Sequence, residues 1–148
     1  MTNAIQVIVE HAAKIKNGKH DKVQPGQPLR FSEACTVNDR IWQGDLALTI
    51  SNKVPEGYTK SKKKILQLVP GENVGSRHVL DSLDGVKMYI PQNWNEESLI
   101  GPYLILYQER TVEHPIHGPV TIPAGFSVHC TYQREYDKEQ EREHRARD

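Results

Sequence analysis

The chain has 148 residues, and its 19 lysines and arginines balance its 19 aspartates and glutamates. This length predicts one domain, and the neutral charge excludes a global field that would attract nucleic acid, an anionic membrane or an acidic ligand. No stretch approaches the roughly 18 apolar residues of a membrane span, and the N-terminus lacks the pattern of a secretory signal. We therefore expect a cytoplasmic protein without a membrane partner.

Residues 1–30 are predicted to be an N-terminal extension or an added strand. Residues 3–16 fit both an alternating strand and a helical spacing of apolar residues, and we favour a strand that ends near Glu10 because Ile and Val prefer strands. Residues 17–30 carry two prolines and two glycines, which is typical of a loop.

Residues 31–136 are predicted to form the β core. Short apolar runs recur at about ten-residue spacing with Gly and Pro between them, which indicates an antiparallel barrel or sandwich of about seven to nine strands. Asp84 and Gly85 are expected to close a hairpin between two of the runs. The predicted strands are residues 46–50, 65–69, 78–82, 86–90, 103–112, 119–122 and 126–132.

Residues 137–148 form a charged tail whose one apolar residue is Ala146. No face of this segment would dock on a core. Glu141 and Arg145 are four residues apart and would support a helix, whereas such a tail is usually a solvated or frayed terminus. We expect a polar tail, with a helix as one alternative.

The two cysteines, Cys35 and Cys130, lie far apart in the sequence and form no CxxC pair. This usage favours reduced thiols over a disulfide framework, with a single bridge as the alternative. A nucleophilic Cys130 activated by His129 is excluded because adjacent strand residues face opposite ways.

Four histidines on predicted β structure form the sharpest chemical pattern. Two of them flank the proline turn HPIHGP, and strand 126–132 should carry a third back beside that turn. Imidazoles that meet inside a β domain, with a neighbouring carboxylate, would suit Zn, Fe, Ni or Mn. The alternative is a turn whose two rings face water. The residues of this metal hypothesis are His78, His114, His117, His129 and Glu113.

The stretch GPVTIPAGFSVH resembles the second motif of the cupin barrels, in which a glycine, a P-x-G turn and a metal-binding histidine follow in order. The resemblance implies a β-barrel and a metal-dependent activity on a small molecule. His129 follows Gly125 after three residues where the family has two, so its ring is expected on the opposite face of the strand. The first cupin motif is absent.

Segments WQGDLAL, GSRHVL, EHPIHGPVTIPAG and QREY resemble, in this order, a group of small uncharacterised bacterial proteins with no established activity. The resemblance implies a shared fold. Where that group often has a second histidine in the glycine segment, this chain has Ser76 and Arg77. The positions that the resemblance marks are Gln43, Gly44, Asp45, His78, His117, Gly118, Gln133, Arg134, Glu135 and Tyr136, of which Gln43, Asp45, Gln133, Arg134, Glu135 and Tyr136 form a candidate binding surface.

The stretch TKSKKK is a further candidate site. Clustered lysines release counterions when they contact phosphates, although the segment has no interleaved aromatic residues and also suits a solvated loop. The lysines of this nucleic-acid hypothesis are Lys60, Lys62, Lys63 and Lys64.

These patterns predict a non-enzymatic binding or accessory module as the leading function, because no catalytic constellation is recognisable. Its partner would be an unknown protein or small molecule, self-association is left open, and no cofactor is expected. The alternative is a cupin-like metal-dependent enzyme with a divalent metal. A nucleic-acid-binding module is the third interpretation.

Overall fold

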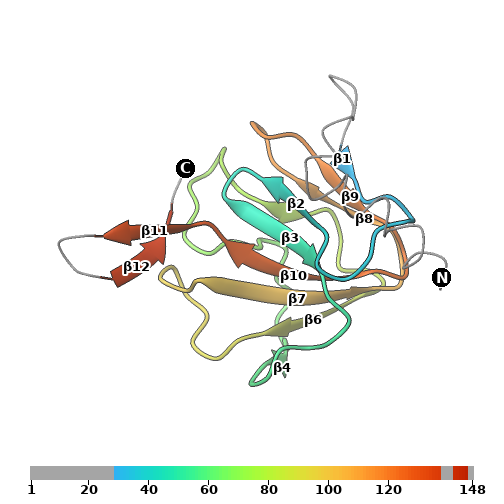
Figure 1. Ribbon diagram of the computed structural model, residues 1–148, viewed down its shortest axis with the longest axis horizontal. Helices are drawn as coiled ribbons and strands as arrows, with labels where there is room; N and C mark the ends of the chain where they lie inside the picture. Colours follow the sequence, from blue (N-terminus) through green and yellow to red (C-terminus); the bar gives the residue numbers. More distant parts are fainter. Residues whose placement is uncertain (1–28, 138–141, 147–148) are drawn as a thin grey trace.

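The computed structural model describes residues 29–137 and 142–146, with the backbone alone for residues 135–137 and 142–143 (Figure 1). All regular structure in this part of the chain is β-strand, and no helix there is long and apolar enough to cross a membrane. The expectations for residues 3–16 lie outside the described residues.

The larger sheet has six strands, all paired antiparallel. Of its long strands, β10 alternates buried and half-buried residues, and β3 and β7 are mostly buried. This pattern is expected of a sheet that packs on a core. In order, its strands are β2 (Arg40–Gln43), β3 (Leu46–Ile50), β10 (Ser127–Tyr132), β7 (Ile100–Leu106), β6 (Val86–Ile90) and β4 (Thr59–Lys60).

The smaller sheet has four strands, and its edge strand β1 pairs with β9 in parallel while the other pairs are antiparallel. In order, its strands are β1 (Leu29–Arg30), β9 (Val120–Ile122), β8 (Arg110–Glu113) and β5 (Val79–Leu80). A separate hairpin of β11 (Arg134–Asp137) and β12 (Arg142–Arg145) projects from one end of the molecule (Figure 1).

One apolar core is shared by the two main sheets. Leu48, Leu104 and Val128 of the larger sheet and Val112 and Ile122 of the smaller sheet are all buried in it. Burying each such side chain contributes about 1.5–3 kcal/mol. The mainly β prediction is therefore confirmed, and of its two alternatives the sandwich is the one observed, because neither sheet closes into a barrel.

Strand 46–50 is confirmed, and strands 119–122 and 126–132 are confirmed to within about a residue at their starts. The predicted hairpin between 78–82 and 86–90 is wrong, because β5 pairs with β8 in one sheet while β6 pairs with β7 in the other. The predicted single strand 103–112 is also wrong, since the chain leaves the larger sheet after β7 and enters the smaller one at β8.

Two further predictions are corrected by the backbone pairing. Residues 65–69 form one isolated bridge, Gln67 with Val79, rather than a strand. The tail at 142–145 is strand rather than helix, because it pairs with residues 134–137. The described residues thus contain twelve strands, more than predicted. The run 103–112 was divided between the sheets, the tail added a hairpin, and the short strands β2 and β4 were not predicted.

Candidate metal centre

The register of the smaller sheet places His78 opposite His114. β5 and β8 pair antiparallel with Val79 opposite Glu113, so the next pair outward along the two strands is His78 and His114. Their ring centroids are 4.4 Å apart and both residues are buried. Two histidines that are 36 positions apart in the sequence are therefore held together by the strand pairing itself.

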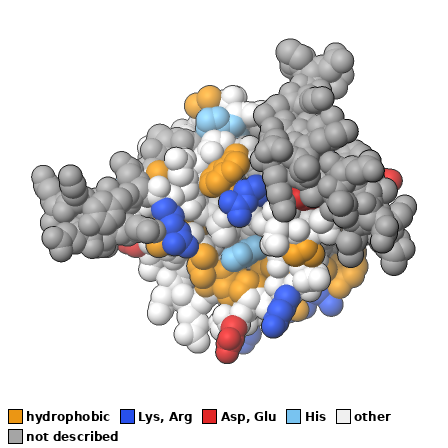
Figure 2. All heavy atoms as spheres, viewed as in Figure 1, with side chains coloured by type: hydrophobic (Ala, Val, Ile, Leu, Met, Phe, Trp, Pro, Cys, Tyr) orange, Lys and Arg blue, Asp and Glu red, His pale blue; other side chains and the backbone are white. Residues whose placement is uncertain are grey.

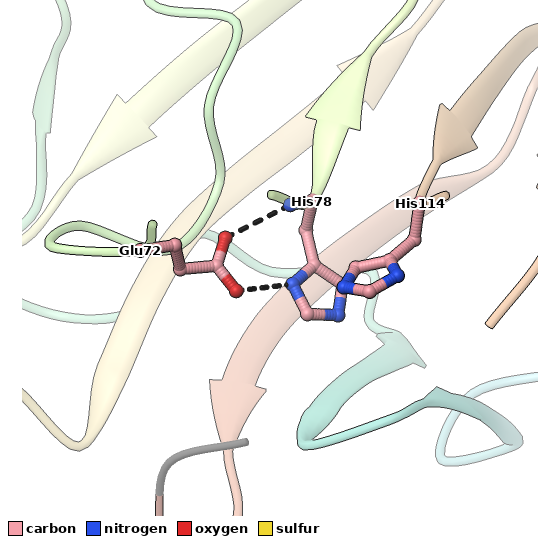
Figure 3. Close-up of side chains that lie close together, drawn as sticks. All are labelled: Glu72, His78 and His114. Atoms are coloured by element: carbon pink, nitrogen blue, oxygen red, sulfur yellow. Dashed lines mark hydrogen bonds and ion pairs between the residues drawn. The ribbon is translucent and has the colours of Figure 1, made fainter. Parts of the chain in front are cut away.

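Both nitrogens of the His78 ring face acceptors. Nδ1 lies 2.6 Å from Oε2 of Glu72 (Figure 3). Nε2 lies 2.7 Å from the backbone oxygen of Gln43 and 3.8 Å from Oδ1 of Asp45. Burial lowers the pKa of His78, but the hydrogen bond and charge of Glu72, with help from Gln43 and Asp45, raise it overall. A ring with acceptors at both nitrogens carries both protons, so the metal-free site holds an imidazolium.

Glu72 belongs to a loop that joins Pro70 to Ser76. Gly71 and Gly75 of this loop have φ angles of +82° and +91°, a conformation that favours glycine. The loop turns Glu72 so that its second oxygen, Oε1, also accepts the backbone N–H of His78 at 2.8 Å. Its side chain is 9% exposed, so the carboxylate is held by two contacts in a desolvated position.

The ring of His114 closes the turn that follows β8. Nδ1 accepts the backbone N–H groups of Ile116 and His117, each at 3.1 Å, and the N–H of Gly118 bonds to the His114 carbonyl. Gly118 has a φ angle of 78°, which lets the turn end there. Because Nδ1 accepts, the neutral His114 ring carries its proton on Nε2.

Nε2 of His114 is buried and has no partner in acceptable hydrogen-bond geometry among the described residues. Burial lowers the pKa of His114, and the neighbouring His78 and His117 lower it further, while the Ser76 carbonyl and Glu72 oppose this. His114 therefore holds a second ring proton less readily than His78 does. A buried nitrogen without a partner is costly, which marks it as a position that a ligand would satisfy.

Glu72, His78 and His114 each bring one ligand atom within 4.8 Å of the others. Tetrahedral zinc with bonds of about 2.0–2.1 Å needs donors roughly 3.4 Å apart, so a small inward movement would complete the geometry. Gln43 supplies the outer contact that metal-bound histidines usually have, because its carbonyl accepts Nε2–H of His78 and leaves Nδ1 to face the ion. In the metal-free protein a proton lies between Nδ1 and Glu72.

The other residues of the metal hypothesis lie outside this group of three. His117 is exposed, with its ring centroid 4.4 Å from that of His114 and 6.3 Å from that of His78. Glu113 is exposed beside His114 and is not in the group of three. His129 lies on β10, where Val128, Cys130 and Tyr132 face the core, so its ring points to the outer face of the larger sheet. It contacts the Tyr58 hydroxyl at 2.7 Å.

Gln43 and Asp45 are buried and so do not form part of an exposed surface. The Gln43 side chain donates to the carbonyls of Val112 and Gly118, which ties the end of β2 to β8 and to the turn that follows it. Gln133 and Arg134 are exposed and begin the hairpin, while the side chains of Glu135 and Tyr136 lie outside the described residues. The sequence segments QGD, GSRH and HGP therefore converge around His78.

Glu72 is the residue that sequence reasoning missed. It precedes His78 by six residues in a loop bounded by glycines, and no periodicity marks a loop carboxylate. The only available signal was its place between Gly71 and Gly75, where a tight loop returns an acidic side chain toward the following histidine.

Two remaining groups lie apart from this centre. The side chains of Lys60, Lys62, Lys63 and Lys64 are exposed. On the face drawn in Figure 2 the Lys and Arg side chains are scattered rather than gathered in one patch, and histidines reach the surface at two separate places. Cys35 and Cys130 are free and buried, and burial raises the pKa of both thiols, to about 11 for Cys35.

The chain belongs to a protein family described as a domain of unknown function (DUF8820), whose model matches residues 42–130. The matched residues make up more than half of the chain and include Glu72, His78 and His114. No curated protein and no solved structure matches the chain.

Proposed function

We propose that the protein is a binding module that holds one divalent transition-metal ion, with zinc as the reference case, at Glu72, His78 and His114. The observation that carries this proposal is the group of Glu72, His78 and His114, which each bring one ligand atom within 4.8 Å of the others. In addition, the buried Nε2 of His114 has no partner in acceptable hydrogen-bond geometry within the part of the chain that the structure describes. Two imidazoles and one carboxylate form a ligand set that zinc accepts, with a further position left for water or a ligand.

Metal binding at this centre would be coupled to the loss of one proton. The ion would take the place of the proton between Nδ1 of His78 and Glu72, which is released, while the His114 ring would move its proton from Nε2 to Nδ1 without a net loss. Nδ1 of His114 then has to give up or share its two backbone N–H contacts, which are long at 3.1 Å. The loss of these contacts lowers the affinity for the ion. The release of a proton makes this affinity fall as the pH falls.

A titration that removes one donor and keeps the turn tests the proposal. His114→Asn offers an amide oxygen near the position of Nδ1, so the N–H groups of Ile116 and His117 keep an acceptor while Nε2 is lost. The protein is purified without a histidine tag, stripped with a chelator and titrated with zinc by calorimetry. His129→Phe is the matched control, because His129 lies on the other sheet.

The expected result is one zinc per chain for the wild type and for His129→Phe. For His114→Asn we expect a loss of affinity larger than the roughly 10- to 100-fold effect of removing an outer-shell contact. Equal affinity of His114→Asn and the wild type, or no zinc binding by the wild type, would overturn the proposal.

A further inference from the structure

An open cleft of about 420 Å³ lies where strands β5 and β8 meet the loop 70–76 and the turn after β8. Its volume is near the lower end of the roughly 300–1,000 Å³ that small-molecule sites occupy. Of the proposed metal ligands only His114 borders this cleft, so what the cleft binds depends on its other residues. Besides His114, the cleft is lined by Gly75, Arg77, Val79, Glu113, Pro115 and Pro119.

The uncharged walls of the cleft are apolar and stiff. Val79 is half-buried on β5, and Pro115 and Pro119 flank the turn that follows β8. Each proline ring fixes its own φ angle, so these walls keep their shape. Gly75 has a φ angle of +91°, and a Cβ at this position would have no other atom within 4 Å, so the loop side of the cleft is open. An apolar group that enters the cleft therefore meets a preformed apolar surface.

Two exposed side chains of opposite charge, Arg77 and Glu113, also line the cleft. Within the part of the chain that the structure describes, the ion pairs involve other residues, and neither of these two side chains has a hydrogen-bond partner. The Arg77 guanidinium can receive a carboxylate through two parallel hydrogen bonds, and the Glu113 carboxylate can accept hydrogen bonds from an ammonium group. The cleft thus offers one partner for each charge of a zwitterion, beside apolar walls.

We propose that this cleft binds a small apolar α-amino acid in its zwitterionic form. Arg77 binds the carboxylate and Glu113 binds the ammonium group, while the aliphatic side chain of the ligand packs on the apolar walls. A ligand with only one of the two charges leaves either Arg77 or Glu113 without a partner, which favours the zwitterion over a simple acid or a simple amine. The site is additional to the proposed metal centre and does not require the ion.

L-Leucine is the probe, and its binding to the full chain is followed by NMR titration. The protein is stripped of metal, because the amine and carboxylate of a free amino acid bind zinc themselves. N-acetyl-L-leucine lacks the ammonium group and L-leucinamide lacks the carboxylate. Each analogue should bind about fivefold more weakly than leucine, as expected for the loss of one exposed ion pair. Glycine lacks the aliphatic side chain and should also bind several-fold more weakly.

Two substitutions assign the contacts. Arg77→Gln should reduce the affinity for leucine to about the level that the wild type has for leucinamide. Glu113→Gln should reduce it to about the level that the wild type has for N-acetyl-leucine. Arg40→Gln is the matched control and should bind leucine as the wild type does, because Arg40 is exposed on β2 of the larger sheet. All three side chains are exposed, so the melting temperatures should stay close to that of the wild type.

Absence of saturable leucine binding would contradict the amino-acid site. Equal affinities for leucine and glycine, or for leucine and either blocked analogue, would also contradict it, as would a wild-type affinity for leucine in Arg77→Gln or Glu113→Gln. Because the titration uses metal-free protein, these results leave the metal centre standing, and a failure to bind zinc leaves the amino-acid site standing.

Discussion

The molecule places imidazoles at both of its main sheets, and their surroundings differ in charge. His78, beside the smaller sheet, faces Glu72 on one nitrogen and the Gln43 carbonyl on the other, with Asp45 close by. His129, on the larger sheet, faces the neutral hydroxyl of Tyr58, which itself donates to the Gly101 carbonyl. The pKa of His78 is raised, whereas burial lowers the pKa of His129.

This difference shows what turns a half-buried or buried histidine into a cation site. Both rings are removed from water, and removal from water alone keeps a ring neutral. A positive charge, either a proton or a metal ion, is stabilised only at the ring that carboxylates approach. That ring is His78, which Glu72 approaches from a loop and Asp45 from the turn after β2. Substitutions around His78 should therefore change stability and metal binding more than substitutions around His129.

The largest expected effect is on stability, from replacing each ring in turn. His78→Phe leaves the carboxylates of Glu72 and Asp45 without their buried cation and should lower the free energy of unfolding by about 3–5 kcal/mol. His129→Phe removes one hydrogen bond, while Tyr58 keeps its bond to Gly101, and should cost about 1 kcal/mol. Urea denaturation of both variants, metal-free, measures the difference, and equal losses would contradict the comparison.

A third imidazole added near His78 should have the next largest effect, which is on zinc affinity. Ser76 and Glu72 line the same polar hollow of about 260 Å³, so a side chain at position 76 begins close to the carboxylate that would hold the ion. Ser76→His should place a third imidazole near the ion and tighten zinc binding about tenfold, roughly 1.4 kcal/mol. Ser76→Ala is the control and should bind zinc as the wild type does; a Ser76→His affinity no better than that of Ser76→Ala would argue against this placement of the ion.

The smallest effect is the pH dependence of stability in the metal-free protein. The folded pKa of His78 is raised above 6.5, so its contribution is fully present below pH 6.5 and is lost as the pH rises through the folded pKa. His114 and His129 have lowered pKa values, so their contributions are present above pH 6.5 and are lost as the pH falls below it. Stability attributable to the histidines should therefore be greatest near pH 6.5.

Glu72→Gln separates the two sides of this profile. The amide oxygen can still accept a hydrogen bond from Nδ1 of His78, and the substitution removes the charge that raises the pKa of this ring. The amide NH2 then faces the backbone N–H of His78, so the variant should also be less stable at every pH. Thermal denaturation from pH 5 to 9 should show a flatter alkaline side for Glu72→Gln and an unchanged acidic side. An alkaline slope equal to that of the wild type would assign the titration to another group.

Local patterns predicted much of the fold, because strands such as 46–50 and 126–132 combine β-branched and aromatic residues with turn residues at their ends. They did not predict which sheet each strand joins. The bends at Leu83–Gly85 and Tyr107–Glu109 look like a hairpin turn and a continuous strand, yet the chain changes sheets at both. That choice depends on the shared core, which no local window contains.

The candidate site likewise has parts that local patterns predicted and parts that depend on the tertiary fold. Histidines on β structure were conspicuous in the sequence, and period-two alternation explains why His129 turns outward. Glu72 lies in a loop that carried no pattern, and the spacing of Arg145 from Glu141 suggested a helix in a solvated tail. Their buried positions follow from a loop closed by glycines and from a hairpin that returns to Pro70 and Tyr132.

X-ray absorption at the zinc edge tests the central claim most directly. The zinc-loaded wild type should show two imidazole ligands with Zn–N distances of about 2.0–2.1 Å and oxygen in the remaining positions. His114→Asn should show at most one imidazole, and His129→Phe should match the wild type. A shell of oxygen alone, or two imidazoles retained in His114→Asn, would contradict a metal centre at Glu72, His78 and His114.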